Sequence, residues 1–148
     1  MSVTYQREPV ATVLAEGRTL FTAHYAEIGE TFYGKPFALD ESFFLAAEAA
    51  GAMRLFTARF DAQLIGYSAH AVTRHPLCDA KQAQQLVFIV AKSFRGSGVG
   101  RELLTFADAA LAAEGVEFLF QNAALAPMAK MLERAGYKHI DNTYLRRL

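Results

Sequence analysis

The chain has 148 residues, 15 acidic and 15 basic, and this neutral total argues against an extended nucleic-acid surface. Apolar residues make up 53% of it and aromatic residues 12%, which excludes a disordered chain and predicts one domain with a buried core. No apolar run approaches the roughly 20 residues of a membrane span, and the start lacks a signal-peptide pattern, so we expect a cytoplasmic protein with no membrane partner.

The first third of the chain predicts one strand and two helices. Residues 3–7 suit a short strand, and apolar residues then recur on one face of a helix over residues 9–28. Asp40 or Ser42 is suited to cap a second helix, which Gly51 ends because glycine tolerates a left-handed backbone.

The middle third predicts an antiparallel hairpin and then a buried strand. Residues 53–60 and 64–72 read as strands joined by a turn at 61–63. The apolar run within residues 84–92 predicts a fully buried strand. The chain has one cysteine, Cys78, so it cannot form an internal disulfide, and no Cys/His cluster has the spacing of zinc ligands.

The final third predicts a helix over residues 98–114, a strand over 116–121, a helix over 127–135 and two short strands within 137–148. Over the whole chain, the predicted order mixes local hairpins with crossover helices. This order predicts an α/β (α+β) fold, with a mixed central sheet of about six or seven strands flanked by about four helices.

A glycine-rich segment, Arg95-Gly96-Ser97-Gly98-Val99-Gly100, lies between the buried strand and a predicted helix. A strand, a glycine turn and a helix start together aim free backbone N–H groups and the helix dipole at one point, which predicts a phosphate site. A P-loop is excluded because Arg101-Glu102 follows Gly100 where Lys-Ser/Thr is required. A dinucleotide fingerprint fits poorly, since the sixth position from Gly96 is Arg101.

Arg95, Gly98 and Gly100 fill the pattern Arg/Gln-x-x-Gly-x-Gly/Ala, and here the chain resembles the GNAT superfamily of acyl-CoA-dependent N-acetyltransferases. Residues 88–96 are similar to the family's Leu-x-Val-x-Pro-x-Tyr-Arg-Gly, with Lys92 in place of proline. The order of predicted elements also matches that fold, so the resemblance implies a single GNAT-like domain over residues 1–148. The segment from His24 to Ile28 resembles phage-encoded members.

The resemblance implies acetyl-CoA as cofactor and acetyl transfer to an amine by direct attack in a ternary complex. In the family, amides of the glycine loop hold the pyrophosphate of coenzyme A, and the middle of the preceding strand binds the pantetheine arm. Dimers are common among relatives, so a homodimer is expected as well. The cofactor-binding residues implied are Phe88, Ile89, Val90, Arg95, Gly96, Ser97, Gly98, Val99, Gly100, Arg101 and Asn122.

Catalytic residues are less clearly marked. In many relatives a Tyr acts as the general acid at the position where this chain has Leu132. Tyr144 is therefore the candidate to protonate the leaving thiolate. Glu27 is the candidate base, and His70 is a second one because its ordinary pKa suits proton transfer near neutrality. His24, one helical turn from Glu27, is predicted to bind the substrate. The alternative function is a catalytically impaired GNAT-fold protein that binds coenzyme A in a structural or regulatory role.

Aromatic residues gather between and within the first two helices. Phe43 and Phe44 fall at helical positions and are expected in the core, whereas Tyr33 is expected to line the acceptor pocket. The sequence does not identify the amine.

Overall fold

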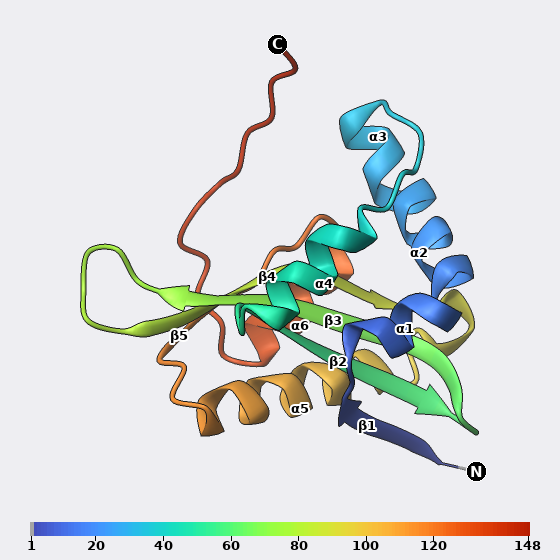
Figure 1. The fold of residues 1–148 in the computed structure, drawn as a ribbon, viewed down its shortest axis with the longest axis horizontal. Coiled ribbons are helices and arrows are strands. Elements are labelled where there is room, and N and C mark those ends of the chain that lie inside the picture. Colours follow the sequence, from blue (N-terminus) through green and yellow to red (C-terminus); the bar gives the residue numbers. More distant parts are fainter. Residues whose placement is uncertain (1) are drawn as a thin grey trace.

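Residues 2–148 are described by a computed structural model, and they form a mixed α+β fold (Figure 1). The sheet has five strands in the order β1-β2-β3-β4-β5, fewer than the six or seven expected. Neighbours from β1 to β4 are antiparallel, and β5 pairs with β4 in parallel. The strands are β1 (Val3–Arg7), β2 (Met53–Phe60), β3 (Gln63–Arg74), β4 (Lys81–Val90) and β5 (Phe118–Phe120).

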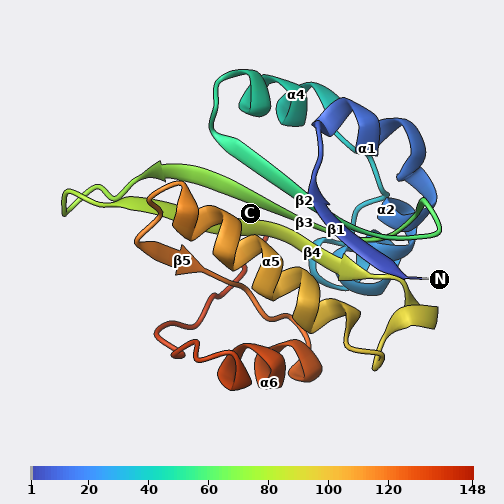
Figure 2. The same cartoon turned by 90° about the horizontal axis from the view of Figure 1, so that it is seen from below.

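Helices cover both faces of the sheet, as Figure 2 shows: α1, α2 and α4 lie on one face, and α5 and α6 on the other. Each face has its own apolar cluster, one built around α5 and one around α1 and α2. No helix of the described residues is long and apolar enough to cross a membrane. The helices are α1 (Val10–Glu16), α2 (Arg18–His24), the π-helical turn η1 (Tyr25–Gly29), α3 (Glu30–Tyr33), α4 (Glu41–Ala49), the short 3-10 turn η2 (Lys92–Phe94), α5 (Val99–Ala113) and α6 (Ala126–Arg134).

The prediction of one helix over residues 9–28 is wrong, because Gly17 separates α1 from α2 and the π-helical turn η1 follows α2. A Cβ at Gly17 would lie 2.4 Å from the Phe21 ring and 2.7 Å from the Val13 carbonyl oxygen, so only glycine permits this close turn between α1 and α2. A Cβ at Gly29 would lie 2.3 Å from the Tyr25 ring, which packs across the π-helical turn. The segment therefore bends around the cavity described below.

The hairpin and the second helix are confirmed. Asp61 and Ala62 both have positive φ, as a two-residue turn between twisted strands requires. The Asp40 carboxylate accepts a hydrogen bond from the Phe43 amide at 3.0 Å and so caps α4.

The predicted strands within residues 137–148 are absent, which explains the smaller sheet. This segment forms no regular element and leaves Ile140 and Tyr144 exposed. The adjacent β5 has only three residues, so it offers a further strand little edge with which to pair. Tyr144 therefore lies on an extended terminal segment and not on a final strand.

A buried ion pair ties β1 to β2 and gives a pH-dependent contribution to stability. The Glu8 carboxylate, 7% exposed, accepts hydrogen bonds from Arg59 at 2.7 and 2.8 Å. These hydrogen bonds lower the pKa of Glu8 from 4.5 to about 2. Because the pKa is depressed in the folded state, the stabilisation is present above about pH 4.5 and is lost as the pH falls toward 2.

The Glu8→Gln variant should therefore lower the free energy of unfolding by about 2 kcal/mol, since Arg59 would lose its buried counter-charge and keep only the more exposed Glu16. Urea unfolding at pH 7 measures this value. Glu41→Gln is the control, because it removes an exposed ion pair to Arg18 and should cost less than about 1 kcal/mol. Equal losses in the two variants would contradict the prediction.

Candidate functional site

The glycine loop presents a row of free backbone donors. Gly96 and Gly98 have φ of +81° and +96°, and the left-handed Gly98 directly precedes α5. The Ser97 hydroxyl donates to the Phe94 carbonyl at 2.6 Å and holds the turn. Within residues 2–148, no protein acceptor receives the amides from Gly96 to Arg101. These free donors lie at the positive end of a 15-residue helix, which favours an anionic ligand.

Gly100 differs from the other two glycines of the loop. Its backbone is helical, and a Cβ there would lie 3.6 Å from the Met131 sulfur and 3.7 Å from a Val90 methyl group, both ordinary contacts. The structure therefore does not require glycine at this position, whereas the positive φ at Gly96 and Gly98 does.

Strands β4 and β5 diverge next to this loop. Their parallel pairing covers only Gln82–Gln84 against Phe118–Phe120. Asn122 marks the end of the pairing, where its side-chain amide donates to the Gln85 carbonyl at 3.1 Å and its backbone N–H to the Gln85 side chain at 3.3 Å. The remaining half of β4 is an open edge on this side.

The open edge exposes the backbone of alternate residues of β4. The Ala91 amide donates to Ile65 of β3, so the backbone groups of Val90, and of Phe88 two residues earlier, face away from β3 toward the gap. Ile89 pairs with Tyr67, and its backbone groups face β3. Of the three strand residues predicted to bind a cofactor, Phe88 and the N–H of Val90 thus face the open edge, and the backbone of Ile89 does not.

Arg95 connects the glycine loop to the π-helical turn η1. Its guanidinium binds both carboxylate oxygens of Glu27 at 2.7 and 2.8 Å, and its Nε donates to the Val90 carbonyl at 2.8 Å. The hydrogen bonds from Arg95 lower the pKa of Glu27. A carboxylate with a lowered pKa is a weaker base, so this geometry favours a positioning role for Glu27.

His24 lies one turn before Glu27 and contacts the sheet. Its Nδ1 is 3.0 Å from the Tyr67 hydroxyl of β3. Burial lowers the pKa of His24 and raises that of Tyr67. The imidazole is therefore neutral near pH 7, the form that accepts a proton. The sequence did not single out Tyr67, because a Tyr within an apolar strand carries no local functional signal.

The structure separates His70 and Tyr144 from this group. His70 is fully buried on the α5 side of the sheet, its Nε2 2.7 Å from the Ser68 hydroxyl and its ring packed near Phe56. Burial lowers the pKa of His70 to about 4, and it lines neither of the cavities described here. Tyr144 is 89% exposed and does not line either cavity. Neither side chain contacts Glu27 or the glycine loop.

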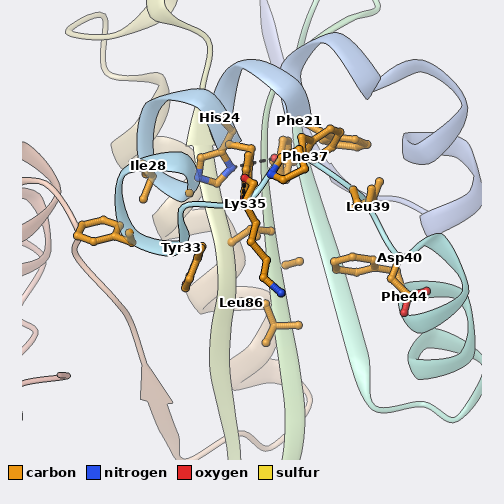
Figure 3. Close-up of a pocket in the computed structure, with 18 of the residues that line it drawn as sticks. Phe21, His24, Ile28, Tyr33, Lys35, Phe37, Leu39, Asp40, Phe44 and Leu86 are labelled. Atoms are coloured by element: carbon orange, nitrogen blue, oxygen red, sulfur yellow. Dashed lines mark hydrogen bonds between the residues drawn. The ribbon is translucent and has the colours of Figure 1, made fainter. Parts of the chain in front are cut away.

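A cavity of about 990 Å³ opens between the sheet and the segment from α2 to α4. Figure 3 shows Lys35 extending toward Leu86 of β4, with Tyr33 and Phe44 on either side in this view. Tyr33, predicted to line the acceptor pocket, is the last residue of α3 and lies on the wall of this cavity. Phe44 lines it and also packs against the core, whereas Phe43 is 53% exposed, so the prediction of a core position for Phe43 is wrong.

A second cavity, of about 510 Å³, lies beside the first. Its lining includes Glu27, Lys92 and Arg95 near the glycine loop. His24 lines both cavities and so marks the place where they adjoin. The site thus combines a loop with free backbone donors, an open strand edge and a large apolar cavity.

Solved structures with this fold cover nearly the whole chain. A ribosomal-protein-alanine N-acetyltransferase from Brucella melitensis biovar Abortus 2308 has 19% identity and a TM-score of 0.76, with 100% of each chain covered. An aminoglycoside acetyltransferase from an uncultured soil metagenomic sample, in complex with sisomicin, has 15% identity and a TM-score of 0.76 over 99% of this chain and 96% of its own. A predicted acetyltransferase from Clostridium acetobutylicum, with acetyl-CoA, has 12% identity and a TM-score of 0.73 over 99% and 96%.

At these identities the structural likeness shows the fold, and no curated protein matches the chain. A family model described as an acetyltransferase (GNAT) domain matches residues 41–139, which is more than half of the chain. That range includes β4, the glycine loop and α5. The extension of one domain over residues 1–148 and the likeness to phage-encoded members stay predictions. The chain belongs to the GNAT acetyltransferase family.

Proposed function

We propose that this protein is an N-acetyltransferase that moves an acetyl group from acetyl-CoA to an amine by direct attack in a ternary complex. The observation that carries the proposal is the row of unpartnered amides from Gly96 to Arg101, at the start of α5 and beside the open edge of β4. A diphosphate fits this row because its oxygens accept several N–H bonds at once and its charge meets the positive helix end.

Different parts of the chain bind different parts of acetyl-CoA. The loop amides hold the diphosphate, and the backbone of Phe88 and the N–H of Val90 on the open edge pair with the amide groups of the pantetheine arm. Lys92 and Arg101 add positive charge next to the loop. Acetyl-CoA supplies an acyl thioester that is already activated, so the protein has to orient the amine and accept its proton.

His24 is the proposed proton acceptor. It lies where the two cavities adjoin, and burial keeps its imidazole neutral near pH 7. Glu27, the base predicted from the sequence, is held by Arg95, and this ion pair favours a role in positioning Arg95 over a role as base. The proposed cytoplasmic location and homodimer rest on the family alone.

The alternative function, a coenzyme A-binding protein without turnover, has one observation in its favour. Leu132 is buried in α6 at the position where many relatives carry an acidic Tyr, and it has no proton to donate. In the acetyltransferase, the thiolate then leaves by taking a proton from solvent.

Calorimetry and a thiol-release assay test the proposal. The purified protein should bind acetyl-CoA and free coenzyme A saturably and should not bind ATP. Free thiol should then appear when an amine is added. Binding without turnover over a broad amine panel would favour the alternative, and absence of acetyl-CoA binding would overturn both functions.

A further inference from the structure

We propose that the acceptor is a monoamine with an aromatic or long apolar body that fills the large cavity, an inference that rests on the acetyltransferase function proposed above. Three features of the described residues support this substrate class: the lining of the cavity, the charges at its walls and its position relative to β4.

The lining is mostly aromatic and aliphatic. Aromatic rings come from α2, η1, α3, the following loop, α4 and β3, so they surround the space from several sides. The volume of about 990 Å³ lies at the upper end of the range for sites that take drug-sized ligands, about 300–1,000 Å³. An apolar body buried here would leave water and gain contact with the rings of Phe21, Tyr33, Phe37, Phe44 and Tyr67.

The charged groups disfavour a second ammonium group on the acceptor. Among the described residues that line the cavity, Asp40 is the one carboxylate, and it already accepts hydrogen bonds from Ser42 and the Phe43 amide. Lys35 and Arg147 place two cations along the wall. A polycationic amine would meet like charges here with no free carboxylate to bind it.

The cavity leads to the edge where transfer would occur. Leu86 and Val87 of β4 line it immediately before Phe88, whose backbone faces the gap between β4 and β5. His24 lines the same cavity farther along β4, where it bonds to Tyr67 opposite Ile89. An acceptor with its apolar body in the cavity therefore presents its amine near the open edge and the proposed base.

A thiol-release assay with matched amines tests the inference. From propylamine through pentylamine to heptylamine, kcat/KM should rise by about fourfold for each added methylene, because each is transferred from water into the cavity. Phenethylamine should be accepted, and hexylamine should exceed hexamethylenediamine, its diamine analogue. Sisomicin and spermidine should be poor acceptors.

Two variants with matched controls link the preference to the cavity. Tyr33→Ala should lower kcat/KM for phenethylamine by about tenfold. Phe43→Ala is its control: Phe43 is 53% exposed and Tyr33 56%, but Phe43 does not line the cavity. Lys35→Glu should reduce the preference for hexylamine over its diamine by about tenfold, and Lys138→Glu, outside the cavity, should not change it.

The outcomes separate this inference from the function on which it rests. Acetyl-CoA binding together with turnover of sisomicin or spermidine, and not of apolar amines, would overturn the apolar class and leave the acetyltransferase intact. A flat alkylamine series would also overturn it. Absence of acetyl-CoA binding would overturn the enzyme itself, and the acceptor class with it.

Discussion

Replacing Gly98 with valine should weaken acetyl-CoA binding by about 100-fold while α5 remains folded. The φ of +96° at Gly98 is one that a β-branched residue does not adopt without strain, so the turn must move and the amides after it lose their common direction. The nearest atoms to an added Cβ belong to Glu102 and Arg101, at 3.7 and 3.8 Å, so the effect comes from the backbone and not from a clash. Calorimetry with acetyl-CoA measures it.

Gly115→Val is the matched control for that experiment. Gly115 follows the other end of α5, has a φ of +85° and has no atom within 4 Å of an added Cβ. The two variants should therefore lose similar amounts of stability in thermal unfolding, and only Gly98→Val should lose affinity. Unchanged affinity in Gly98→Val would remove the loop from the binding site.

Changing Glu27 to glutamine should raise the Kd for acetyl-CoA by about tenfold and leave the pH dependence of kcat unaltered. The glutamine keeps the size of the side chain but loses the two charged contacts that fix Arg95 beside the loop. Because Arg95 lowers the pKa of Glu27, any limb that this carboxylate contributed to a pH profile would lie below its ordinary pKa of 4.5.

The opposite result would support the role predicted from the sequence. A large fall in kcat with unchanged acetyl-CoA affinity, and an altered pH profile, would identify Glu27 as the base. Glu30→Gln is the control, since Glu30 is exposed on the same helical segment and lines neither cavity. In a double-mutant cycle, Arg95→Gln should make the effect of Glu27→Gln largely disappear.

The elements that the sequence predicted well are those with local causes. Asp61 and Ala62 make a turn with their own backbone, and Asp40 caps α4 within three residues. The break at Gly17 and the π-helical turn after α2 were missed because they accompany the close approach of Phe21 to Gly17 and of Tyr25 to Gly29, which no periodicity reports. The prediction of strands in residues 137–148 was wrong because a strand needs an edge with which to pair, and β5 is too short to offer one.

The same distinction applies to the candidate site. The glycine loop could be predicted because its spacing is local, and the structure places its amides without protein partners. The ion pair between Glu27 and Arg95 joins residues far apart in sequence, so it changed the role expected of Glu27. Tyr67 and Leu86 line the large cavity although neither carried a signal, because strand residues acquire such positions only when the sheet and helices pack.

Arg95 links the two proposed binding sites. It is bonded to η1, which borders the large cavity, and to the end of β4 beside the glycine loop. A molecule that shifts η1 on entering the cavity also shifts this guanidinium, so the free energies of occupying the two sites are not independent. If a bound amine changes the affinity for the thioester by some factor, thermodynamic linkage requires that the bound thioester change the affinity for the amine by the same factor.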